Sequence, residues 1–150
     1  LSLHDALPIY LKSARTLQSS RILLIPAEAV RHYFARDAAF ARTLAVELAV
    51  AFRRVGKELK NQKLRSSLER LANWLLAYRA GKNNGNPFEL PFEKRVLAAR
   101  LGMAPEVLSR CFATLASYKL KVNGSTIEIH DVDALTKLAR PSPTIDNPQS

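Results

Sequence analysis

Three polar side chains of complementary hydrogen-bonding type stand close together in the sequence. Glu106, Ser109 and Arg110 lie at positions i, i+3 and i+4, so on a helix their side chains would leave the same face. An arginine can bond a guanine with two hydrogen bonds, a glutamate accepts one from the cytosine amino group, and a serine can donate or accept. The pattern therefore predicts a helix that reads base edges in the major groove of DNA. An ordinary helical hairpin with a solvated Glu and Arg is the alternative interpretation.

Residues 92–115 have the spacing of a helix-turn-helix, whose second helix would carry these three side chains. Gly102 suits the left-handed backbone of a sharp turn between helices, and Pro105 suits the first turn of the second helix. The first helix would bury a face made of Leu97, Ala98 and Leu101. The second would bury a stripe at spacings of three and four, made of Leu108, Cys111, Phe112 and Leu115.

A predicted β-hairpin follows the helix-turn-helix. Residues 120–122 and 126–129 read as two short strands, and Asn123-Gly124 is typical of the tight turn between them. Such a hairpin is a wing, which disfavours the ordinary-hairpin interpretation. Residues 90–115 and 121–139 together resemble the C-terminal winged-helix domain of the Crp/Fnr family of bacterial transcription regulators.

The resemblance implies a role for each side chain of the predicted reading helix. The E-x-x-S-R pattern of Glu106, Ser109 and Arg110 resembles the Fnr-like branch, which implies a half-site containing TTGA. In that family the Glu and Arg positions read bases, and the Ser contributes beside them. Pro105 has no side-chain donor where some relatives have one, so the outer base of the site stays open.

The charge of the chain favours a polyanionic partner such as double-stranded DNA. Lys and Arg number 23 against 13 Asp and Glu, a net charge of +10, although a merely soluble basic protein would also fit this number. Basic residues on the first helix and near the wing are candidates for phosphate contacts, which position a protein without specifying sequence. These candidates are Lys94, Arg95, Arg100, Lys119 and Lys121.

The elements that precede this domain are predicted to be a leader, a sensor remnant and a long helix. Residues 1–9 resemble a translated sequencing adapter and are expected to be a non-native leader, the alternative being a genuine short helix. Residues 10–36 would be the remnant of a jelly-roll, cyclic-nucleotide-binding-like sensor domain, with strands at 13–17 and 21–25 and a helix at 27–36. An exposed edge at residues 22–25 is expected, because two strands are not a stable sheet.

Residues 37–65 are predicted to be a dimerisation helix with Asp37 as its N-cap. Gly56 interrupts good helix formers and would mark a close approach of two such helices. The apolar seam expected to meet a second copy consists of Phe40, Leu44, Leu48, Ala51, Val55 and Leu59.

Residues 66–140 are predicted to be the winged helix-turn-helix domain and residues 141–150 a disordered tail with three prolines. Ser66 or Ser67 would cap a core helix that contains Trp74, and residues 131–139 would form a closing helix. The predicted fold class is mainly α with small β elements. It combines the long dimerisation helix and the winged domain with the last strands of a truncated sensor.

The effector cannot be read from these residues. Cyclic AMP is disfavoured, because the Thr-Ser pair of relatives that bind it is replaced by Val55-Gly56-Lys57. The single cysteine excludes cysteine-only ligation of an iron–sulfur cluster, so a cluster or a heme would need upstream residues. His32 is a candidate heme or metal ligand, or an ordinary side chain, since no second ligand stands at metal spacing.

The predicted function is that of a dimeric, sequence-specific transcription regulator in the bacterial cytoplasm. The resemblance adds RNA polymerase as a partner, and no apolar run reaches the ~20 residues of a membrane span. The alternative is a winged-helix protein-interaction module that does not read DNA sequence. An enzyme is the weakest hypothesis, because the sequence has no nucleophile elbow, phosphate-binding glycine loop or His-Glu-x-x-His motif.

Overall fold

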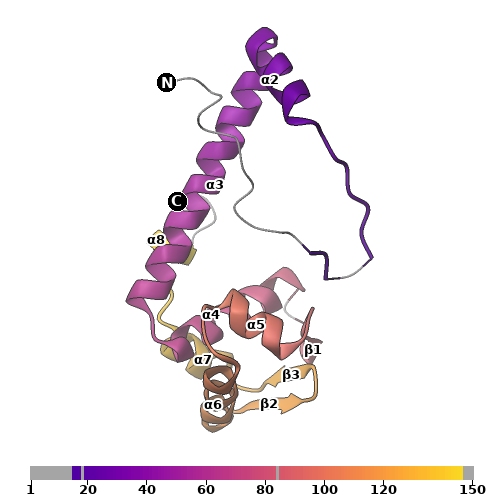
Figure 1. The fold of residues 1–150 in the computed structure, drawn as a ribbon. Coiled ribbons are helices and arrows are strands. Elements are labelled where there is room, and N and C mark those ends of the chain that lie inside the picture. The colour runs from indigo at the N-terminus through magenta and orange to yellow at the C-terminus, as the bar shows by residue number, and fades with distance from the viewer. Residues whose placement is uncertain (1–14, 18, 84, 147–150) are drawn as a thin grey trace.

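A long helical rod and a small mixed domain make up this computed structural model, which describes residues 15–17, 19–83 and 85–146. The rod consists of α2 (Ala27–Arg36) and α3 (Ala38–Leu64), and the domain lies at the C-terminal end of α3 (Figure 1). Mostly helical structure with one three-stranded sheet confirms the predicted fold class.

The start of α3 is set by Asp37, as predicted. Its carboxylate accepts hydrogen bonds from the backbone N–H groups of Ala39 at 2.9 Å and Phe40 at 3.0 Å, which satisfies donors that have no partner inside the helix. No residue of α3 is buried in the single chain. Leu48 is 62% exposed and Val55 is 67% exposed, so the predicted seam lies uncovered. That a second copy of the chain covers this seam remains a prediction.

The strand predictions at the N-terminal end are wrong where the structure describes them. Residues 15–17 and 21–25 have no strand structure. Leu23 and Leu24 are more than 80% exposed, whereas the predicted strand would be buried on both faces. The physical reason is that a strand is stable only when a neighbour satisfies its backbone groups, and no described strand lies beside it. The expected exposure of residues 22–25 is confirmed, and the predicted leader at residues 1–9 lies outside the described residues.

The domain begins at a capping box on α4 (Ser67–Gly81). The Ser66 hydroxyl accepts from the Glu69 N–H at 3.2 Å, and the Glu69 carboxylate accepts from the Ser66 N–H at 2.7 Å, so Ser66 is the cap. The backbone hydrogen bond from Ser66, followed by the one from its hydroxyl, lowers the pKa of Glu69. Trp74 on this helix packs in the protein as predicted, with its ring stacked on Tyr78 at 5.1 Å between centroids.

The helix-turn-helix is confirmed as α5 (Lys94–Arg100) and α6 (Pro105–Leu115), with Pro105 in the first turn of α6. Gly102 has φ +61°, a conformation in which a Cβ is strained, so the turn does require glycine there. Both predicted apolar faces point into one core with α4, the sheet and α7. The buried residues of the two helices and their turn are Leu97, Ala98, Leu101, Leu108, Cys111, Phe112 and Leu115.

The wing is confirmed as β2 (Leu120–Asn123) and β3 (Thr126–Ile129), which follow the 3-10 turn η1 (Ala116–Tyr118). The two strands are antiparallel, with Leu120 opposite Ile129 and Asn123 opposite Thr126. Gly124 has φ +61° in the connecting turn. The short strand β1 (Phe88–Glu89) pairs with the other edge of β3, so the strand order is β1-β3-β2 (Figure 1).

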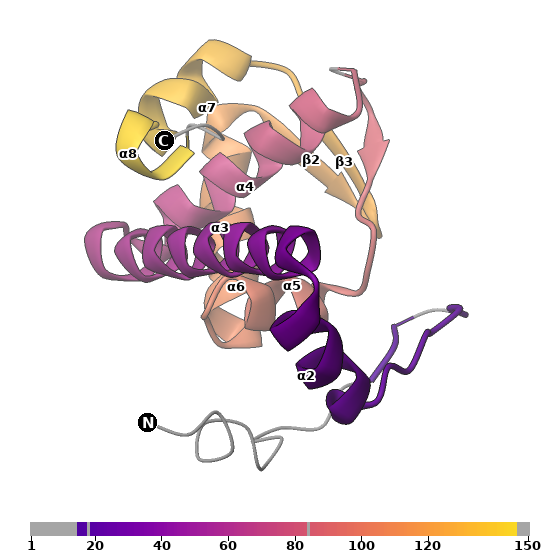
Figure 2. The same cartoon turned by 90° about the horizontal axis from the view of Figure 1, so that it is seen from above.

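The C-terminal part of the chain closes the domain and then returns to the rod. The predicted closing helix is α7 (Val132–Ala139), and its Leu135 is fully buried. The predicted disorder of residues 141–150 is wrong for α8 (Pro143–Asp146), which lies beside the C-terminal half of α3 in both views (Figures 1 and 2). The reason is an ion pair between Asp146 and Arg65, a contact across 81 positions that composition does not reveal. Residues 147–150 lie outside the described residues.

Candidate nucleic-acid interface

The exposed face of α6 carries the three side chains that the sequence predicts for base reading. Glu106, Ser109 and Arg110 are exposed, whereas the opposite face of the helix is buried in the core. Within the described part of the chain, no ion pair or side-chain hydrogen bond holds the carboxylate of Glu106 or the guanidinium of Arg110. The Ser109 hydroxyl donates to the Pro105 carbonyl at 3.1 Å, which leaves its oxygen able to accept.

A basic groove runs between α6 and the wing. It has a volume of about 480 Å³, and Lys94, Ser109 and Lys121 line it together. The Lys94 ammonium lies 5.6 Å from the centroid of the Phe112 ring, a cation–π contact that keeps the charge at the edge of the groove. The structure therefore brings two of the predicted phosphate-contacting lysines to the side of a predicted base-reading residue.

The other three predicted phosphate contacts do not share this groove. Lys119 lies 3.6 Å from the Asp131 carboxylate, although its side chain is 71% exposed. That carboxylate has a lowered pKa, first because it accepts a hydrogen bond from the Ala134 N–H at 2.9 Å and then because of Lys119. Arg95 is exposed on α5. Arg100 lines a separate cavity against α3, on a different side of the domain from the groove.

A buried arginine that the sequence reasoning missed supports the helix-turn-helix from behind. Arg70 is 8% exposed, and its Nε donates to the Leu101 carbonyl at 3.0 Å. Its Nη1 donates to the carbonyls of Arg65 at 2.8 Å and Gln62 at 3.3 Å, at the end of α3. One guanidinium thus ties the long helix to the turn before α6. An arginine between Leu68, Leu71 and Leu75 on a predicted core helix was the signal that could have found it.

A second buried arginine, also missed, holds the chain's last described helix. Arg65 forms a two-pronged hydrogen bond and ion pair with the Asp146 carboxylate, with Nη1 to Oδ1 at 2.9 Å. Burial raises the pKa of Asp146, but hydrogen bonds from Arg65 and from the Ser142 N–H outweigh it, so the pKa lies below its usual value. Arg65 and Arg70 therefore both stabilise the junction between α3 and the domain.

Neither metal chemistry nor thiol chemistry is indicated at this interface. Burial raises the pKa of Cys111, so its thiol is protonated at neutral pH and packs as an apolar core group. In the ranges that the structure describes, His, Cys, Asp and Glu form no group of three able to hold a metal ion. His32 instead contacts the Arg36 guanidinium one turn along α2. None of the described helices combines the length and apolar character of a bilayer crossing.

The family described as the Crp-like helix-turn-helix domain matches residues 69–138, which span α4 to α7. No curated protein matches the chain.

Solved structures of several proteins are similar to most of this chain. FixK2 from Bradyrhizobium japonicum is 21% identical with a TM-score of 0.61, covering 77% of this chain and 59% of its own. A putative transcriptional regulator of the Crp/Fnr family from Eubacterium rectale is 22% identical with a TM-score of 0.65, covering 79% and 54%. A putative cAMP-binding regulatory protein from Silicibacter pomeroyi is 26% identical with a TM-score of 0.55, covering 78% and 51%. The chain thus spans between about half and three fifths of these proteins.

Proposed function

We propose that this chain, whose residues 69–138 match the Crp-like helix-turn-helix domain, is a DNA-binding transcription regulator of the Crp/Fnr family and acts as a dimer that reads a TTGA-type palindrome through α6. The observation that carries the proposal is the set of exposed side chains on α6. Arg110 would bond a guanine with two hydrogen bonds, Glu106 would accept from a cytosine amino group, and the Ser109 oxygen would accept beside them.

The groove beside α6 supports a matching role for the wing. Lys94 and Lys121 flank Ser109 from α5 and β2, so their ammonium groups would meet the phosphates on either side of the bases that α6 reads. These contacts would fix the register of the helix without selecting a sequence. Arg95 is a further phosphate contact of this proposal, whereas Arg100 and Lys119 are weaker candidates because of their surroundings.

The uncovered face of α3 supports dimerisation. Leu48, Val55 and Leu59 are each more than half exposed, and pairing with the same helix of a second copy would remove this apolar surface from water. A two-fold axis along that pair would present two α6 helices to half-sites about one helical turn, roughly 34 Å, apart. A sensor domain that begins before residue 37 would shift this spacing in response to its signal, in a cytoplasmic protein that contacts RNA polymerase.

Fluorescence anisotropy with labelled duplexes tests the proposal. One duplex carries TTGA and TCAA half-sites one turn apart, and the other carries the same bases scrambled, at the same salt concentration. We expect a clear preference for the palindrome. Equal, weak and salt-insensitive binding to both duplexes by a protein that light scattering shows to be a dimer would contradict it and would favour a protein-interaction module.

Arg110→Ala separates base reading from phosphate contact. We expect it to weaken binding to the palindrome by about 1–3 kcal/mol and to relax the preference for one guanine, because the bidentate contact is lost. Lys63→Ala, which removes an exposed charge from α3, is the matched control and should leave the preference unchanged. An equal loss on all sequences with Arg110→Ala would make this residue a phosphate contact.

A further inference from the structure

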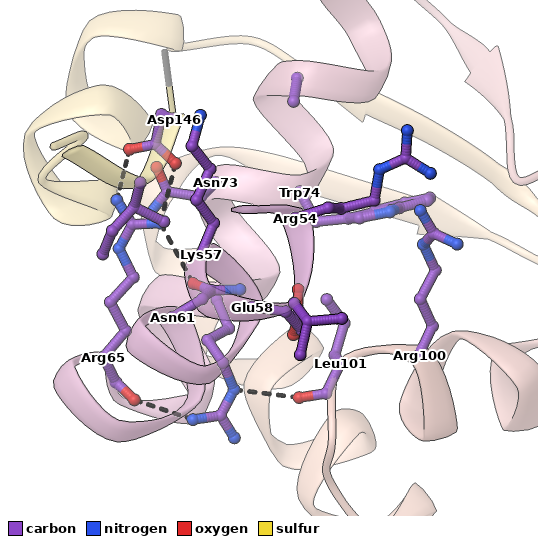
Figure 3. Close-up of a pocket in the computed structure, with 14 residues that line it drawn as sticks. Arg54, Lys57, Glu58, Asn61, Arg65, Asn73, Trp74, Arg100, Leu101 and Asp146 are labelled. Atoms are coloured by element: carbon purple, nitrogen blue, oxygen red, sulfur yellow. Dashed lines mark hydrogen bonds and ion pairs between the residues drawn. The ribbon is translucent and has the colours of Figure 1, made fainter. Parts of the chain in front are cut away.

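A cavity of about 530 Å³ lies between the long helix and the domain, and it shares no lining residue with the proposed DNA groove. Its walls come from four elements: α3, α4, α8 and the end of α5 (Figure 3). The proposed reading of DNA uses none of its side chains apart from Arg100, one of the two weaker phosphate candidates. The cavity is therefore separate from the surface that is proposed to read DNA.

The lining of the cavity is cationic, and most of its charges are already satisfied. The Arg65 guanidinium is bound to the Asp146 carboxylate, and the Arg70 guanidinium is bound to backbone carbonyls. The other acid of the lining, Glu58, accepts a hydrogen bond from the Gln62 side chain at 3.3 Å. These groups shape the cavity, and its lining keeps a net positive charge, with five basic side chains against two acidic ones.

Two arginines of the lining are not satisfied. Arg54 on α3 and Arg100 at the end of α5 are exposed, and within the described residues neither guanidinium has an ion pair or a side-chain hydrogen bond. Figure 3 shows both side chains beside Trp74, which lines the same cavity. These two cations come from different elements and line one cavity, which raises the local potential there and favours an anion.

Trp74 supplies an apolar surface beside these charges. Tyr78 stacks on the indole at 5.1 Å with an interplanar angle of 9°, yet the half-buried indole still lines the cavity. Most of the cavity surface is apolar, contributed by side chains such as Val55, Ala77 and Ile145. An aromatic wall next to two forked guanidinium donors is complementary to a planar ring that carries a carboxylate.

We propose that this cavity binds a small aromatic carboxylate, with its ring against Trp74 and its carboxylate on Arg54 and Arg100. Such a ligand contacts the long helix through Arg54 and the domain through Trp74 and Arg100. It therefore stabilises the orientation of the domain on α3 that the structure shows. The proposal does not depend on DNA reading, since no base-reading side chain lines the cavity.

The chain contains its own reporter for this site, because Trp74 is its one tryptophan. The experiment titrates the full chain with 4-nitrobenzoate, which quenches indole fluorescence, and in parallel with the uncharged 4-nitrobenzamide. We expect saturable quenching by the carboxylate, reversed by competition with benzoate, and only linear collisional quenching by the amide. Equal quenching curves for the two compounds would overturn the proposal.

Three variants assign the binding to the two arginines. Arg100→Gln and Arg54→Gln should each raise the dissociation constant of 4-nitrobenzoate about tenfold, the loss expected for one charge-assisted hydrogen bond. Arg53→Gln removes a neighbouring exposed charge on α3 outside the cavity lining and should leave the constant unchanged. Circular dichroism melting confirms that each variant is folded. An equal effect of Arg53→Gln, or no effect of the two cavity variants, would overturn the assignment.

Discussion

Replacing Arg70 with methionine tests whether one guanidinium holds the helix-turn-helix on α3. Methionine keeps an unbranched apolar chain of similar length, so the change removes mainly the donors. The structure gives two short bonds that would be lost, to the carbonyls of Leu101 at 3.0 Å and Arg65 at 2.8 Å. Three longer bonds, of 3.2 to 3.5 Å, join the guanidinium to the Gln62 carbonyl, the Ser67 hydroxyl and the Gly102 carbonyl. A buried acceptor left without its donor costs about 1–3 kcal/mol. Two such acceptors predict a loss of about 2–6 kcal/mol in the free energy of unfolding.

That loss is large against the 5–15 kcal/mol that is typical of a whole domain, at about two fifths of the total. Urea unfolding followed by far-ultraviolet circular dichroism measures it, with Arg95→Met on the exposed face of α5 as the matched control. We expect the control to change the free energy of unfolding by less than about 0.5 kcal/mol. A loss below about 1 kcal/mol for Arg70→Met would refute the reasoning, because water would then be satisfying the carbonyls as well as the arginine does.

Three further predictions concern the wing, the rod and the C-terminal helix. Lys121→Ala should weaken binding to the palindromic and scrambled duplexes alike and flatten the salt dependence of the binding constant, and an unchanged slope would remove Lys121 from the interface. Gly56→Ala should raise the dimer dissociation constant measured by sedimentation equilibrium, because the added methyl group would separate two closely approaching helices. In the single chain an added Cβ at this position would have no atom within 4 Å, so the substitution should not disturb the monomer. An equal or tighter dimer would contradict a close helix approach. The lowered pKa of Asp146 predicts a stabilisation that is complete above the unfolded-state pKa of about 4 and is lost as the pH falls through the lower folded-state pKa. Asp146→Asn should therefore lower the melting temperature at pH 7 and reduce its dependence on pH below about 4, and an unaltered pH profile would count against the ion pair with Arg65.

The features that the sequence predicted correctly have local causes. Asp37 caps α3 by bonding N–H groups two and three positions away, and Gly102 and Pro105 set the turn and the start of α6 through their own backbone preferences. The stripe on α6 was readable because the helical period decides which side chains share a face. The same period placed Glu106 and Arg110 opposite the core.

What the sequence left open depends on partners far along the chain. Residues 21–25 have the composition of a strand, but a strand also needs a neighbouring strand, and composition does not say whether one is present. The bonds of Arg70 to Leu101 span 31 positions, and the pair of Arg65 and Asp146 spans 81.

Periodicity shows which face of an element is apolar, but it carries no information on which distant group a buried charge will meet. By itself the sequence therefore determined the helix-turn-helix, its wing and the exposed face of α6. Only the tertiary structure decided where that unit sits on α3, which basic side chains share the groove, and that Arg54, Trp74 and Arg100 line one cavity.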